Sequence, residues 1–125
     1  MIDQNPEDLL FYLTGYYPPP TGGYKSEAEA KMEGGALDCL GKPLRTLQDY
    51  KPGSYVSTAV DKKIIKLGTF YEIEGHPGVV FKACDVGSAI KGAHIDICVK
   101  DKKESYKVTA KGRKIKILPK PEGLK

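Results

Sequence analysis

Short runs of strand-forming residues, divided by turn residues, dominate the second half of this chain. Val, Ile, Tyr and Phe gather in brief segments that end at clusters of Gly, Pro, Asp and Lys. This pattern is typical of short strands joined by tight turns rather than of long helices. Six or more short strands in so short a chain favour a mainly β fold, either a small barrel or a sandwich. We predict strands over residues 55–60, 69–73, 79–84, 93–99, 106–110 and 115–118.

The first third of the chain adds one strand and one helix to this expectation. An apolar and aromatic run at residues 9–17 predicts a strand, which three consecutive prolines end. Ser26 and the glutamate three residues later form a capping box, so a short helix should follow and end at Gly34. We expect the 125 residues to form a single domain, 1–125, with a flexible tail at 119–125.

Charge is unevenly divided along the chain. Residues 1–50 hold 4 Lys/Arg and 8 Asp/Glu, a balance of −4, whereas residues 51–125 hold 16 and 8, a balance of +8. The basic half suits an acidic partner such as nucleic acid, anionic lipid or an anionic wall polymer, or it is a solvated lysine-rich surface. Only Tyr106 adds an aromatic ring to the basic run 100–116, so we expect no nucleic-acid partner.

The cysteines and histidines do not form a metal-binding pattern. Cys39, Cys84 and Cys98 are an odd number and match no zinc spacing. The two histidines, His76 and His94, have no Cys or His partner at ligand spacing. We therefore expect no metal and free, partly buried cysteines, with a Cys84–Cys98 bridge left open if their strands are neighbours.

The first residues carry no targeting signal. Residues 1–5, Met-Ile-Asp-Gln-Asn, lack the basic start and the apolar core of a secretory signal peptide. No segment approaches the ~20 apolar residues of a transmembrane helix. We expect the protein to be made in the cytoplasm, without a signal peptide, and not to insert into a membrane.

One aspartate lies in the middle of a predicted strand. Strand residues alternate between two faces, so the apolar residues of 93–99 share one face while His94, Asp96 and Cys98 share the other. The apolar face belongs in the core, which turns Asp96 away from it beside His94. A carboxylate there is either an exposed surface group or one kept for chemistry.

Two further aspartates end predicted strands. Asp61 follows the strand at 55–60, and Asp85 follows the strand at 79–84. Aspartates at strand ends often hydrogen-bond their own turns, which is the ordinary explanation for each alone. Three aspartates near strand ends that converge would be a stronger signal, because glycoside cleavage needs carboxylates in a cleft, one of them protonated.

Three segments around these aspartates form a recognisable pattern: Ala59-Val60-Asp61, Lys66-Leu67-Gly68-Thr69 and, most specifically, Asp85-Val86-Gly87-Ser88-Ala89-Ile90-Lys91-Gly92-Ala93-His94-Ile95-Asp96. They resemble the signature of the three-aspartate (3D) domain, found in the membrane-bound lytic transglycosylase A family and in stationary-phase survival muralytic proteins. The resemblance covers roughly residues 55–118, and Thr14-Gly15-Tyr16-Tyr17 resembles the family's first strand. It implies a small six-stranded double-psi β-barrel, here with one short helix.

The resemblance also implies an activity. A peptidoglycan lytic transglycosylase cleaves the bond between N-acetylmuramic acid and N-acetylglucosamine and leaves a 1,6-anhydromuramyl end, without metal or cofactor. Asp96 would be the acid/base, with Asp85 and Asp61 clustered near it and Asp85 stabilising charge. Like-charge repulsion within the cluster could raise the pKa of Asp96 toward the working pH.

Neighbouring residues are candidates for contact with the glycan. His94 would position Asp96, or is a surface histidine. Gly87 and Gly92 would each adopt a positive φ or let the sugar approach the backbone. Tyr16 and Tyr17 would stack on sugars, or belong to the core. The loop residues Ser88 and Lys91 complete the predicted substrate-binding set.

The chain departs from the larger transglycosylases of this family, which have a second domain as the other wall of a groove. The glycan site should therefore be shallow. With no signal peptide, the chain fits a phage-encoded protein that reaches the cell wall on the virion or through a holin, as an endolysin does. Its partners would be glycan strands and other phage tail or virion proteins. The alternative is a non-catalytic peptidoglycan-binding or structural component of a phage tail.

Overall fold

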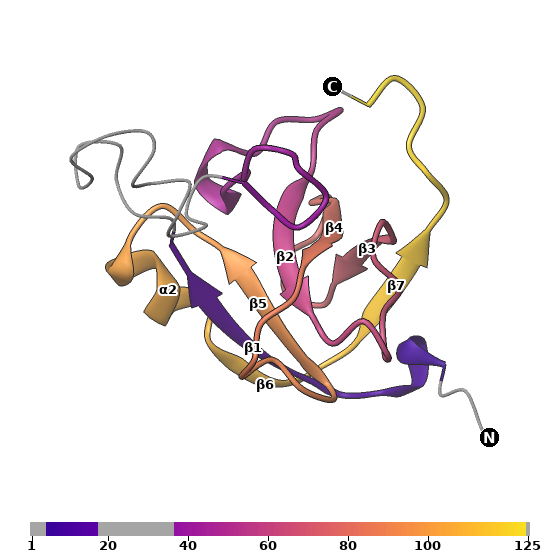
Figure 1. Cartoon of the computed structure of the whole chain (residues 1–125), viewed down its shortest axis with the longest axis vertical. Helices are drawn as coiled ribbons and strands as arrows, with labels where there is room; N and C mark the ends of the chain where they lie inside the picture. Colours follow the sequence, from indigo (N-terminus) through magenta and orange to yellow (C-terminus); the bar gives the residue numbers. More distant parts are fainter. Residues whose placement is uncertain (1–4, 18–36, 125) are drawn as a thin grey trace.

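A single sheet of seven strands forms the structure of this protein, a computed structural model that describes residues 5–17 and 37–124. The strands follow the order β6-β1-β5-β2-β4-β3-β7 (Figure 1). The described residues also hold one α-helix, α2 (Lys102–Val108), and two single-turn 3-10 helices, Pro6–Asp8 and Leu47–Asp49. The strands are β1 (Phe11–Tyr16), β2 (Val56–Val60), β3 (Phe70–Ile73), β4 (Phe81–Asp85), β5 (His94–Cys98), β6 (Ala110–Arg113) and β7 (Ile115–Leu118).

The last two strands bring the edges of the sheet together. β6 pairs antiparallel with β1, β7 pairs antiparallel with β3, and only Lys114 separates β6 from β7. Lys114 is held at this break by Glu74, whose Oε1 accepts from the Lys114 N–H at 3.0 Å and whose N–H donates to the Lys114 carbonyl at 2.9 Å. One chain segment therefore nearly closes the barrel. The mainly β, double-psi-like fold is confirmed, but with seven strands rather than six, because the closing strand is divided.

The core lies inside this barrel. In β4 and β5 the apolar residues of one face are fully buried, as the alternation of the sequence predicts, and all five residues of β2 are buried. Parallel pairing of β1 with β5 and of β2 with β4 brings segments that are distant in sequence into one core. The large side chains buried in this core include Phe11, Leu13, Val56, Val60, Tyr71, Phe81, Ile95 and Ile97 of the strands and Ile65 of the connection between β2 and β3.

One predicted strand is wrong. Residues 106–110 were expected to be extended, but the chain is helical over α2 and becomes a strand only at Ala110. Asp101 caps the helix by accepting from the Glu104 N–H at 2.9 Å, and Glu104 pairs with Lys107 at 3.1 Å. The spacing of Asp101 and Glu104 is itself a helix-start signal, so the sequence contained this information.

Most other predictions can be placed. β1 to β5 and β7 lie within the predicted strand ranges or within a residue of them. The helix predicted after Ser26 lies outside the described residues. Cys84 and Cys98 are buried and free, because β2 separates their strands. In the described part of the chain no helix has the length and hydropathy needed to cross a bilayer.

The helix α2 packs on the outside of the barrel against β1 (Figure 1). Gly15 of β1 makes this possible, since a Cβ there would lie 2.6 Å from the Ser105 Cα and 2.8 Å from a methyl group of Val108. Ser105 and Val108 are the buried residues of the helix. The position requires glycine for close approach, because no side chain fits between β1 and α2.

We predict that Gly15→Ala lowers the free energy of unfolding by about 1–3 kcal/mol, the usual cost of overpacking. The cause is the contact with helix backbone, which can be relieved only by moving α2. Urea denaturation followed by circular dichroism measures the change. Tyr106→Ala on the same helix, where the side chain is 68% exposed, should change stability by less than about 0.5 kcal/mol. Equal effects of the two substitutions would contradict this explanation.

Candidate active site

The three predicted aspartates lie at one end of three neighbouring strands. Ala59 of β2 pairs with Asp96 of β5 on one side and with Asp85 of β4 on the other. Directly paired residues point to the same face of a sheet, so Asp85 and Asp96 share a face across Ala59. Asp61 follows the end of β2, two residues beyond Ala59. The fold therefore brings together residues that are 35 positions apart in the sequence.

A β-bulge turns Asp85 to this face. Thr58 pairs with Ala83, but the next residue, Ala59, pairs with Asp85, so Cys84 is one extra residue in β4. Strict alternation would place Asp85 on the core face together with Phe81 and Ala83. The extra residue reverses that, which is a common use of bulges near functional sites. Sequence alternation alone could not have placed Asp85.

Asp96 is connected to His94 through a threonine of β1. Thr14 pairs with Asp96 in the sheet, and its hydroxyl donates to Asp96 Oδ1 at 2.8 Å. The same hydroxyl lies 2.8 Å from His94 Nε2. A hydroxyl has only one hydrogen, so while Thr14 donates to the carboxylate, His94 Nε2 must be the donor to Thr14. Tyr12 packs beside the His94 ring, with centroids 5.2 Å apart.

Thr14 is the residue that sequence reasoning missed. It was noticed only as part of the segment that resembles the family's first strand, without a role of its own. The contact joins residues 82 positions apart and depends on the parallel register of β1 and β5. Because Thr14 and Asp96 come from opposite ends of the chain, no local motif could have indicated the hydrogen bond.

Asp61 holds the loop between β4 and β5. Its Oδ2 accepts from the Gly92 N–H at 2.9 Å and its Oδ1 from the Lys63 N–H at 3.0 Å. Gly92 has a φ of +68°, so one expected role for this glycine, a positive φ, is present. The carboxylate thus ties the end of β2 to Gly92, two residues before the strand that contains Asp96.

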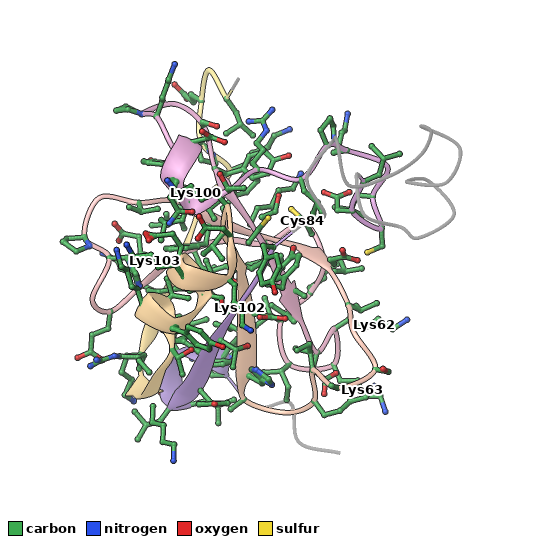
Figure 2. The ribbon with its side chains drawn as sticks, turned by 90° about the vertical axis from the view of Figure 1, so that its left-hand side faces the viewer. Lys62, Lys63, Cys84, Lys100, Lys102 and Lys103 are labelled. Carbon is green, nitrogen blue, oxygen red and sulfur yellow. The ribbon has the colours of Figure 1, made fainter. Side chains whose placement is uncertain are left out.

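A hollow of about 350 Å³ lies beside Asp61. Three residues predicted to contact substrate, Gly87, Ser88 and Lys91, line it, whereas Asp85 and Asp96 do not. Figure 2 shows Lys62 and Lys63, which also line this hollow, projecting outward from the barrel. The remaining lining residues are Val60, Asp61, Val86 and Ile90.

Residues 56–118 match the family model of the 3D domain, which is just over half of the chain. The chain belongs to the 3D domain family. A relative named "Putative cell wall shaping protein YabE", from Bacillus subtilis (strain 168), is 43% identical over 60 residues. The match covers 48% of this chain but only 14% of that protein, so the likeness is confined to one part of a much longer relative.

Burial raises the pKa of Asp96 in this 3D domain. The hydrogen bond from Thr14 and the charge of His94 act in the opposite direction and stabilise the carboxylate. Repulsion from the other two aspartates, expected from the sequence, is not among the causes. Ala59 separates Asp85 from Asp96 by two strand spacings, roughly 10 Å between Cα atoms. At that separation in a partly solvated site, the repulsion between the two carboxylates is weaker than the effect of burial.

Asp85 has a different carboxylate neighbour. Burial is the main cause of its raised pKa, and the charge of Asp38 adds to it, while the Val86 N–H at 3.0 Å opposes the shift. Asp38 is 5% exposed, and its Oδ1 accepts from the N–H groups of Leu40 and Lys42 at 2.9 Å each. The proximity of Asp38 to Asp85 was not predicted from the sequence.

The two tyrosines have different surroundings. The Tyr16 phenol lies where it is influenced by Cys98, Asp85 and Asp96, and burial raises its pKa well above the ordinary value, so it stays neutral and able to donate. Tyr17 is 43% exposed.

Among residues 5–17 and 37–124, no group of three or more His, Cys, Asp or Glu side chains is arranged to hold a metal ion.

We predict that Thr14→Val raises the pKa of Asp96 further. The substitution keeps the side-chain shape but removes the hydrogen bond to the carboxylate, which is the charged form, so protonation becomes easier. Carboxyl ¹³C NMR titration measures the change. Thr14→Ser keeps the hydroxyl and should leave the pKa close to that of the wild type. A pKa that falls, or is unchanged, in Thr14→Val would refute the role given to Thr14.

We predict a pH-dependent stabilisation by Asp61. Hydrogen bonds from Gly92 and Lys63 lower its pKa below the ordinary 3.8. The stabilisation is therefore fully present above pH 3.8 and is lost as the pH falls through the lower, folded-state pKa. Asp61→Asn should lower the free energy of unfolding at pH 7 by less than about 1 kcal/mol, since the group is largely solvated. The difference in the free energy of unfolding between Asp61→Asn and wild type should vanish in acid. Glu122→Gln should leave the free energy of unfolding unchanged at either pH.

Proposed function

We propose that this 3D domain is a peptidoglycan lytic transglycosylase in which Asp96 is the single acid/base. The observation that carries the proposal is the environment of Asp96. It is a partly buried carboxyl group with a raised pKa that accepts a hydrogen bond from Thr14 and lies on the same face of the sheet as Asp85. Acid/base catalysis requires a carboxyl group that can hold a proton near the working pH and then release it. Burial favours the protonated form, and Thr14 favours the carboxylate.

In the proposed reaction, protonated Asp96 first donates to the glycosidic oxygen between N-acetylmuramic acid and N-acetylglucosamine. The bond from the muramyl anomeric carbon to that oxygen breaks, and the electron pair leaves with the oxygen. Carboxylate Asp96 then accepts the proton of the muramyl C6 hydroxyl, whose oxygen bonds to the anomeric carbon. The product has a 1,6-anhydro end, no water is consumed, and Asp96 is protonated again.

The neighbouring residues support each stage of this reaction. Thr14, with His94 behind it, stabilises the carboxylate form of Asp96 after the proton has left. Asp85 on the same face would stabilise the positive charge that develops at the anomeric carbon. Acid/base action accounts for about 10²–10⁴-fold of the rate, so this charge stabilisation has to supply a further part.

The substrate class is supported from outside the site. The relative from Bacillus subtilis is named for cell wall shaping, and the signature segments resemble those of muralytic transglycosylases. These likenesses support the proposal that the protein acts at the cell wall. The hollow lined by Gly87, Ser88 and Lys91 would contact the glycan next to the bond that is cleaved, and Tyr17 has an exposed ring for sugar stacking.

Digestion of purified peptidoglycan, followed by mass spectrometry of the soluble products, tests the proposal. Wild type should release anhydromuropeptides, and Asp96→Asn should lower the rate by about 10²-fold or more while circular dichroism shows the same fold. Asp8→Asn, at an exposed position in the first 3-10 turn, is the matched control and should keep full activity.

Other product patterns would contradict the proposal. Products that end in reducing muramic acid indicate a hydrolase, because water has replaced the C6 hydroxyl. Sedimentation of the protein with peptidoglycan, without any release of soluble fragments, indicates a wall-binding module in which the aspartates have no catalytic task.

A further inference from the structure

A second hollow, of about 390 Å³, has only positively charged side chains among its ionisable residues apart from one tyrosine. It shares no residue with the hollow beside Asp61. Its four cations come from three segments of the chain, so the fold and not a local run of lysines assembles them. The lining residues are Lys42, Arg45, Tyr55, Gly68, Phe70, Lys82, Lys120 and Leu124.

Aromatic rings hold two of these cations in place. The Arg45 guanidinium lies 4.3 Å from the centroid of the Tyr55 ring and donates to Ser54 Oγ at 2.9 Å. Lys82 Nζ lies 4.9 Å from the same centroid and 5.5 Å from that of Phe70. Tyr55 and Phe70 pack edge to face at 6.1 Å, which makes the platform rigid. Two positive charges at one ring repel each other, and an anion bound between them would offset that repulsion.

The lysines of this hollow have no acidic partner. In residues 5–17 and 37–124, Lys42, Lys82 and Lys120 form no ion pair, and the pair of Lys107 with Glu104 belongs to α2. One carboxyl group, that of Asp38, lies close enough to influence Tyr55, and its Oδ1 accepts from the backbone N–H groups of Leu40 and Lys42. The charges of the three lysines exceed that of this one carboxylate, so positive charge is available to a ligand.

We propose that this hollow is a binding site for an anionic group, a carboxylate or a phosphate. Lys82 is on β4, three residues before Asp85, and the residues on either side of it, Phe81 and Ala83, are in the core. The hollow therefore lies along the same outer face as the candidate active site, roughly 10 Å from Asp85 along the strand. Binding of an anion here does not depend on the proposed reaction. The identity of the anion rests on the proposed function: it would belong to the acidic branches of a wall polymer whose glycan strand reaches Asp96.

Titration of the ¹⁵N-labelled protein with inorganic phosphate and, separately, with acetate tests the site, at constant ionic strength kept by chloride. The largest amide shifts should come from residues that line the hollow. Lys82→Gln should weaken binding about tenfold, the loss of one charge-assisted contact. Lys82→Arg should keep it. Lys103→Gln removes a lysine of α2 outside the hollow (Figure 2) and should have no effect.

The two anions separate the sources. Phosphate bound much more tightly than acetate supports a phosphate-bearing wall polymer, and similar affinities support the carboxylates of stem peptides. If Lys82→Gln does not fold, Lys120→Gln provides the same test from a residue outside the sheet. Shifts spread over the whole lysine-rich surface, or equal weakening by Lys82→Gln and Lys103→Gln, would overturn the proposal. Asp96→Asn should bind both anions normally, so a failure here is distinct from a failure of the proposed reaction.

Discussion

The barrel and the candidate site both depend on the pairing of strand β2 with its two neighbours, β4 and β5. All five of its residues are buried, and its backbone hydrogen-bonds to β4 on one side and to β5 on the other. The same pairing places Asp85 and Asp96 on one face, with Ala59 between them. Because each strand neighbour of β2 contributes one aspartate, a shift in either register would disrupt the core and the site together.

The chemical character of Asp96 follows from packing more than from its acidic neighbours. Ala59 keeps the second carboxylate two strands away, and burial, not repulsion, raises the pKa. Thr14 opposes burial with one hydrogen bond. Opposing effects of this kind let a carboxyl group change its protonation state during a reaction without a metal or a second acid at contact distance.

The outer face of the barrel has an acidic part and a basic part. Asp85 and Asp96 lie on one part of the face, and the hollow around Arg45 and Lys82 lies farther back along β4. The bulge at Cys84 brings both parts onto one face, since it turns Asp85 to the face that Lys82 already occupies. The ligand proposed above, a polymer with acidic branches, would place its negative charges at the basic part of this face.

The sequence by itself determined the approximate limits of most strands and which face of β5 is buried, and it pointed to the three aspartates that the fold brings near one another. Period-two alternation and turn residues are local properties, so they can be seen without a structure. α2 was missed although the capping pair Asp101 and Glu104 was visible. Only the tertiary structure decided the division of the closing strand at Lys114, the bulge that turns Asp85, the contact of Thr14 with Asp96, and the grouping of four cations. Each of these depends on the register between strands distant in sequence, and register is set by the packing of the whole core.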